Sequence, residues 1–121
     1  MDALVIEDDK EIREDFAEIL NEMGLFRRVV LAEDGAIATQ KIHNQMFALI
    51  LLDINLPKKD GISLLADIRK SNQMLDRVLI ISGHLNADVL KEALKFGVKN
   101  YLVKPFDPTV LRDKIQALIK K

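Results

Sequence analysis

Five short apolar runs alternate along the chain with segments whose apolar residues are spaced as on one face of a helix. The runs cover residues 3–6, 29–32, 47–52, 78–81 and 101–103. Apolar residues three or four positions apart predict helices through 12–23, 62–68, 89–96 and 111–118. Strands that are apolar throughout are typical of a parallel sheet with helices on both of its faces.

This alternation predicts a doubly wound, flavodoxin-like α/β fold. The chain contains five strand–helix units in series, and crossovers between parallel strands are right-handed. With the strands numbered along the chain, these constraints favour a five-stranded parallel sheet in the order 2-1-3-4-5.

Residues that favour helix ends and turns punctuate the same pattern. Helix starts are expected at Asp9, Asn86 and Asp107. Helix ends are expected at Gly24 and Gly97. Asp-Gly pairs at 34–35 and 60–61 are predicted turns.

The composition excludes several classes of function. The chain has 121 residues, enough for one domain, and its net charge of −1 gives no electrostatic case for binding nucleic acid or a membrane. The absence of cysteine excludes disulfides and thiolate chemistry and fits a cytoplasmic location. No apolar run approaches the roughly 18 residues of a membrane span.

Charge is distributed unevenly along the chain. Residues 1–22 carry nine acids and two bases, whereas residues 91–121 carry eight bases and three acids. Most of these charges are expected on solvated helix faces, and the two ends of the chain are expected to present different surfaces to partners.

Polar residues stand where the predicted strands end. They are Glu7, Asp8 and Asp9 after the first strand, Asp53 after the third, Ser82 after the fourth and Lys104 after the fifth. In a doubly wound fold the functional site lies beyond the carboxyl ends of the strands. These side chains are therefore expected to converge at one edge of the sheet.

Glu7, Asp8 and Asp53 lie close together if the first and third strands are neighbours. Two negative charges about 4 Å apart repel by roughly 4 kcal/mol at an effective dielectric constant of 20. Either one carboxyl group takes up a proton through a raised pKa, or a cation binds among them. Magnesium fits such oxygen ligands. Asp8, Asp53 and the backbone carbonyl of Asn55 would bind it directly and Glu7 through water, whereas Asp9 is expected to cap a helix.

Lys104 and Ser82 add a cation and a hydroxyl to this cluster. Both would stabilise a phosphoryl group, the lysine by its charge and the serine by donating a hydrogen bond. Asp53 would be the nucleophile, because a carboxylate can accept a phosphoryl group as an acyl phosphate. A structural ion pair between Lys104 and Asp53 is the alternative.

Four segments carry a family resemblance: LVIEDD, LILLDINLPKKDG, VLIISG and NYLVKPF. In this order and spacing they resemble the receiver domain of bacterial two-component response regulators. The resemblance implies one receiver domain over residues 1–121. It implies that Asp53 accepts phosphate from a histidine kinase or phosphotransfer protein with Mg²⁺. The domain would catalyse its own phosphorylation and dephosphorylation without being an enzyme for a separate substrate.

The resemblance also implies a switch. Ser82 matches the switch hydroxyl and Tyr101 the switch aromatic, and the peptide bond between Lys104 and Pro105 is expected to be cis. Once Asp53 is phosphorylated, Ser82 should move toward the phosphoryl oxygens and Tyr101 should turn into the space that Ser82 leaves. The surface altered would comprise the helix after residue 86, the strand at 101–103 and the helix after residue 107.

Three residues depart from the family pattern. Lys59 stands where methionine is common and should affect only the packing of its loop. Gly83 stands where alanine is frequent, which should leave the phosphorylation site more open. His84 occupies a position that influences attack of water on the acyl phosphate, and it is expected to be an ordinary surface residue.

The sequence is also compatible with other functions, and the resemblance implies particular partners. A pseudo-receiver that binds partners without phosphorylation is the main alternative. An aspartate-based phosphatase would need an acid where Asn55 stands, and the glycines form no nucleotide-binding loop. The expected downstream partner is a separate protein or an output domain, and the resemblance also allows a dimer that forms on phosphorylation.

Overall fold

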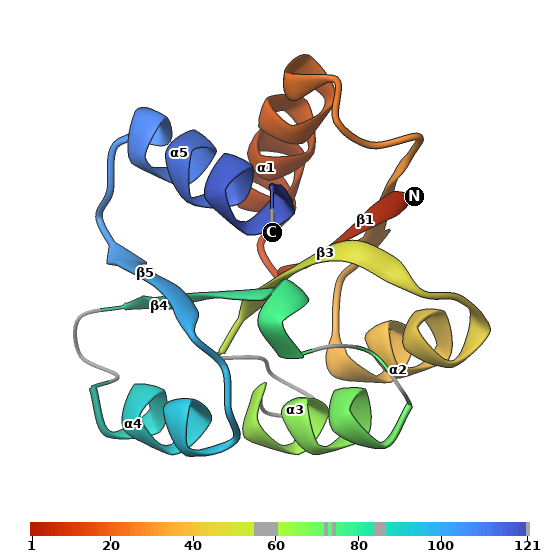
Figure 1. The fold of residues 1–121 in the computed structure, drawn as a ribbon, viewed down its shortest axis with the longest axis vertical. Helices are drawn as coiled ribbons and strands as arrows, with labels where there is room; N and C mark the ends of the chain where they lie inside the picture. Colours follow the sequence, from red (N-terminus) through yellow and green to blue (C-terminus); the bar gives the residue numbers. More distant parts are fainter. Residues whose placement is uncertain (55–60, 72, 74, 84–86, 121) are drawn as a thin grey trace.

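The computed structural model describes residues 1–54, 61–71, 73, 75–83 and 87–120 (Figure 1). Within these ranges the strands are β1 (Asp2–Ile6), β2 (Val29–Ala32), β3 (Phe47–Asp53), β4 (Val78–Gly83) and β5 (Asn100–Lys104). The α-helices are α1 (Lys10–Met23), α2 (Gly35–Asn44), α3 (Gly61–Lys70), α4 (Ala87–Lys95) and α5 (Pro108–Ile119). A short 3-10 helix, η1 (Leu75–Arg77), precedes β4.

The strands form one parallel sheet in the order β2-β1-β3-β4-β5, which confirms the predicted doubly wound α/β fold. Helices α1 and α5 lie together on one face of the sheet, and α2, α3 and α4 lie on the other (Figure 1). The central strands β1 and β3 are covered on both faces, so their side chains are almost entirely buried.

Alternate residues of each strand belong to two separate hydrophobic cores, one on each face of the sheet. On the face of α1 and α5, the core includes Val5, Leu51 and Leu111. On the face of α2, α3 and α4, it includes Ile50 and Leu65. No helix among the described residues is both long enough and apolar enough to traverse a bilayer.

Most predicted helix ends are confirmed. Asp9 accepts a hydrogen bond from the backbone N–H of Ile12 at the start of α1. Asp107 accepts one from the backbone N–H of Thr109 at the start of α5. Gly24 and Gly97 follow α1 and α4 with φ angles of +68° and +107°, a region where residues with a Cβ are strained.

Two turn predictions and one cap need comment. The prediction of a turn at residues 34–35 is wrong, because these residues begin α2. The Asp34 side chain accepts a hydrogen bond from the Ile37 N–H and caps the helix. Gly61 begins α3, and a Cβ there would lie 2.6 Å from the Ile54 carbonyl oxygen, which explains the glycine. Asp60, Lys59 and the expected cap Asn86 lie outside the described residues.

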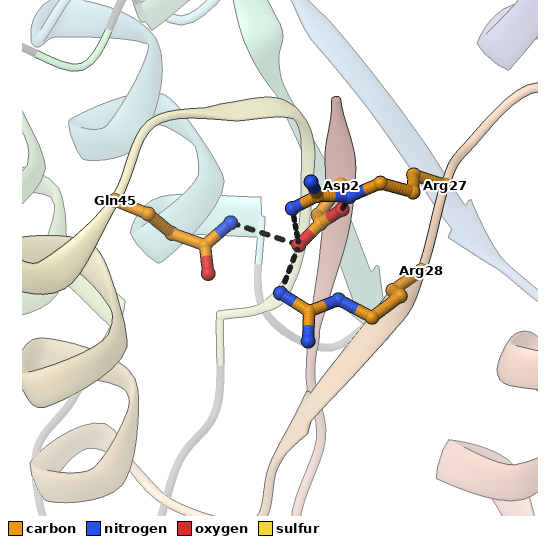
Figure 2. Close-up of polar contacts among 4 residues, drawn as sticks. All are labelled: Asp2, Arg27, Arg28 and Gln45. Carbon is orange, nitrogen blue, oxygen red and sulfur yellow. Dashed lines mark hydrogen bonds and ion pairs between the residues drawn. The ribbon is translucent and has the colours of Figure 1, made fainter.

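A buried carboxylate lies at the edge of the sheet opposite the carboxyl ends of the strands. Asp2, at the start of β1, is only 1% exposed. Its oxygens accept hydrogen bonds from Arg27 and Arg28 on one side and from Gln45 on the other (Figure 2). The hydrogen bonds from Arg27 and Gln45 hold the pKa of Asp2 well below its ordinary range. Asp2 is thus one acid of residues 1–22 that does not lie on a solvated helix face.

We predict that Asp2→Asn lowers the free energy of unfolding at neutral pH, because its amide N–H would face arginine donors. A carboxyl group whose pKa is depressed in the folded state stabilises the fold above its unfolded pKa, and this contribution is lost as pH falls through the folded pKa. The stability difference between wild type and Asp2→Asn should therefore shrink on acidification. Urea unfolding from pH 7 to pH 2 measures it. The exposed Asp113→Asn is the control, and a difference independent of pH would contradict the prediction.

Candidate functional site

The sheet brings three carboxyl groups together at one edge. Ile6 of β1 pairs in register with Leu52 of β3, so Glu7 and Asp53, the next residues, emerge side by side. Ligand oxygens of Glu7, Asp8 and Asp53 all lie within 4.8 Å of one another. The expected proximity of Asp8 and Asp53 is therefore confirmed.

These carboxyl groups border a cleft of about 330 Å³. It is lined by Glu7, Asp8, Asp9, Ile12, Asp53, Gly83 and Lys104. Glu7 and Asp53 are buried at its floor, with 1% and 8% exposure, whereas Asp8 is exposed. The cleft is thus open to a ligand on its Asp8 side and closed behind Glu7.

Glu7 has one satisfied and one unsatisfied oxygen. Its Oε2 accepts a hydrogen bond of 3.1 Å from the backbone N–H of Asp9. Its Oε1 is buried and has no hydrogen-bond partner among the described residues, while Lys104 Nζ lies 3.6 Å away. A buried carboxylate oxygen of this kind is costly unless a further donor or cation reaches it.

Burial, together with the neighbouring Asp8 and Asp53 carboxyl groups, raises the pKa of Glu7 to about 8. In the absence of a cation, Glu7 therefore holds a proton near neutral pH. A divalent ion would remove the need for that proton. Three clustered carboxyl groups and an orphaned buried oxygen fit Mg²⁺, which prefers oxygen ligands and retains several waters.

Ser82 and Lys104 lie at the carboxyl ends of β4 and β5, the two strands on the side of β3 away from β1. Lys104 reaches the carboxyl cluster, and it also lines the cleft. Ser82 is buried, and its Oγ donates a hydrogen bond of 3.1 Å to the carbonyl of Gly83. Both residues lie at the expected edge of the sheet, with Ser82 one residue beyond the pair formed by Asp53 and Ile81.

Tyr101 lies farther from the cleft. It is on β5 beside Ile80 of β4 and is 39% exposed. The peptide bond between Lys104 and Pro105 is cis, as the resemblance implied. Asn55 and His84 lie outside the described residues.

The structure adds a residue that sequence reasoning missed. Arg13 of α1 donates hydrogen bonds from Nη1 to the carbonyls of Glu7 and Asp8, at 2.9 and 3.3 Å. It thereby fixes the backbone that presents two of the carboxyl groups. The only sequence signal for this role is that Arg13 lies in the first turn of the helix that follows the acids. The spacing of charges along the sequence does not reveal that the side chain bonds to backbone carbonyls.

The family model of the response regulator receiver domain matches residues 3–116. The chain belongs to this family, and it is a receiver domain of two-component signalling.

Individual proteins similar to this chain agree with this family assignment. Over 122 residues the chain is 30% identical to the chemotaxis protein CheY of Pseudomonas aeruginosa, covering 100% of this chain and 98% of that protein. It is 34% identical to the transcriptional regulatory protein MalR of Bacillus subtilis over 88% of this chain and 45% of MalR. The chain therefore spans less than half the length of some of its curated relatives.

A solved structure is similar along its whole length. The receiver domain of a sensor histidine kinase from Pseudomonas aeruginosa PAO1 superimposes with a TM-score of 0.86 and is 26% identical, covering 99% of this chain and 98% of that one. That crystal structure has a magnesium ion coordinated in the active site cleft.

We predict that Glu7→Gln removes a pH dependence of stability and weakens Mg²⁺ binding. A carboxyl group with a raised folded pKa contributes stability that is complete below its unfolded pKa and is lost as pH rises through about 8. Wild type without Mg²⁺ should therefore lose stability between pH 5 and pH 8, whereas Glu7→Gln should not. Mg²⁺ affinity should fall by about tenfold or more in the variant, as for residues that act through bound water.

Urea unfolding at both pH values and a Mg²⁺ titration test this prediction. Glu11→Gln, on the exposed side of α1, is the matched control and should behave as wild type. An equal pH dependence in wild type and Glu7→Gln would show that Glu7 does not carry the proton.

Proposed function

We propose that Asp53 accepts a phosphoryl group from a histidine kinase or phosphotransfer protein in a Mg²⁺-dependent reaction. The observation that carries the proposal is the convergence of Glu7, Asp8 and Asp53 within 4.8 Å, with Lys104 Nζ 3.6 Å from Glu7. A cluster that holds a cation beside a lysine suits a transferred group with several negative oxygens.

Asp8 and Asp53 would hold Mg²⁺ directly and Glu7 would hold it through water. The backbone carbonyl of Asn55 is the further expected ligand. When bound, Mg²⁺ neutralises negative charge on the phosphoryl oxygens. The orphaned Glu7 Oε1 supports its role, because a water bound to a cation would donate to it.

The side chains divide the chemistry among them. A carboxylate oxygen of Asp53 attacks phosphorus, the bond from phosphorus to the donor nitrogen breaks, and an acyl phosphate forms. The Lys104 ammonium neutralises one phosphoryl oxygen and the Ser82 hydroxyl donates to another. Ser82 must rotate for this, since its Oγ now donates to Gly83. Attack of water on the acyl phosphate reverses the modification, so the domain catalyses its own phosphorylation and dephosphorylation.

Phosphorylation would shift a pre-existing equilibrium between two conformations. Ser82 turns toward the phosphoryl group, Tyr101 turns inward, and the surface formed by α4, β5 and α5 changes. A coupling free energy of about 1–3 kcal/mol is enough for useful signalling. The exposed Tyr101, Val103 and Leu94 on this surface support an output through protein contacts.

The partners follow from this role. We propose residues 1–121 as one receiver domain that acts on a downstream protein or on an output domain, with no nucleic acid or membrane bound by the domain itself. A dimer that forms on phosphorylation would use the α4, β5 and α5 surface. The cytoplasmic location expected from the cysteine-free sequence stays a prediction.

We predict that acetyl phosphate with Mg²⁺ adds the mass of one phosphoryl group to the intact chain. The adduct should be absent from Asp53→Ala, because the accepting carboxylate is removed, and from wild type treated with a chelator. Intact-mass spectrometry measures it, and Asp113→Asn should retain it. An adduct that persists in Asp53→Ala would refute the role of Asp53, and its absence from wild type would favour the pseudo-receiver alternative.

We predict that Gly83→Ala slows phosphorylation by acetyl phosphate several-fold. Gly83 lines the cleft, and a methyl group there would narrow the approach to Asp53. The initial rate of adduct formation measures the effect. Equal or faster phosphorylation of Gly83→Ala would show that the glycine does not open the site.

A further inference from the structure

Tyr101 points toward the face of the sheet that α4 covers. Side chains alternate between the faces of a strand, and the neighbour Leu102 is buried in the core of α1 and α5. Tyr101 and Val103 therefore project to the opposite face. In register beside them on β4 are Ile80 and Ser82, and Ile80 belongs to the core that includes Ala93 of α4.

The Tyr101 ring is nevertheless contacted by a residue from the other face. Lys114 of α5 places its Nζ 5.9 Å from the ring centroid, within cation–π range. Strand β5 is an edge strand of the sheet (Figure 1). A Tyr101 ring in contact with Lys114 of α5 therefore reaches around the free edge of the sheet. The ring is 39% exposed there.

The face that the ring would enter is thinly covered. Among the α4 side chains that the structure describes, Ala93 alone is fully buried, and Leu94 is 37% exposed. By contrast, α5 buries Leu111, Ile115 and Leu118. Elements with few buried apolar side chains adjust at low cost in free energy. The α4 side of the sheet can therefore rearrange to accommodate the Tyr101 ring in its inward orientation. Helix α5, by contrast, holds Lys114 in a fixed position.

We propose that Lys114 is a positioning residue that holds the Tyr101 ring in its outward orientation and so sets the resting balance of the switch. The inference rests on the proposed function, in which the inward ring accompanies phosphorylation. To turn inward, the ring must leave the Lys114 ammonium. A cation–π contact at an exposed site shifts a two-state equilibrium by about two- to fivefold.

The sequence allows a direct test, because the chain has one tyrosine and no tryptophan. Biosynthetic incorporation of 3-fluorotyrosine gives a fluorine resonance from Tyr101 alone. Its solvent isotope shift between H₂O and D₂O reports the exposure of the ring. The proteins compared are wild type, Lys114→Gln, Lys114→Arg, which keeps the cation, and Lys120→Gln, which removes a charge at the C-cap of the same helix.

Without a phosphodonor, Lys114→Gln should show a smaller isotope shift, since more rings turn inward. Lys114→Arg and Lys120→Gln should resemble wild type. Lys114→Gln should also be phosphorylated by acetyl phosphate about two- to fivefold faster, because the inward state is already more populated. An unchanged or larger isotope shift in Lys114→Gln would overturn the proposal, as it would mean that the ring stays outward and merely loses its cover.

The failure of the proposed function has a different signature. If acetyl phosphate modifies wild type without moving the fluorine resonance, Tyr101 is not part of the switch. The comparison of unphosphorylated proteins still decides whether Lys114 holds the ring.

Discussion

Electrostatic repulsion among Glu7, Asp8 and Asp53 is the constraint on which the site depends. Parallel strands β1 and β3 force these carboxyl groups to one edge, and burial of Glu7 and Asp53 prevents water from screening them. Something positive must therefore join the cluster, whether a proton on Glu7, the ammonium of Lys104 or a metal ion. The proposed binding of a divalent cation and then of a phosphoryl group at this edge follows from that one imbalance.

Much of this arrangement could be predicted from the sequence. Runs such as Phe47–Asp53 are apolar because parallel strands are covered twice, so the strand order and the edge that carries Asp53 follow from pattern and handedness. Residues that end strands are the easiest to place, because the backbone alone decides where they emerge. The proximity of Asp8 and Asp53 needed no knowledge of any side-chain rotamer.

Interactions that depend on side-chain reach were not predictable in the same way. Arg13 binds carbonyls, and Asp2 is buried by arginines some 25 positions away, contacts that no local periodicity encodes. Asp34 shows a subtler limit: an aspartate before glycine favours a turn and a helix cap for the same reason, that its oxygen accepts a nearby backbone N–H. The position of the Tyr101 ring at the edge of the sheet likewise could not be predicted, because it depends on the contact with Lys114.

The buried Asp2 has a consequence for how the domain could evolve. Its network with Arg27, Arg28 and Gln45 ties together the entrances of β1, β2 and β3, at the far end of the sheet from the cleft (Figure 2). Strand β1 is thus anchored at its beginning by Asp2 and leads at its end into the carboxyl groups of Glu7 and Asp8. Loops around the cleft can diverge to suit new signalling partners while the anchored end keeps the strands in register.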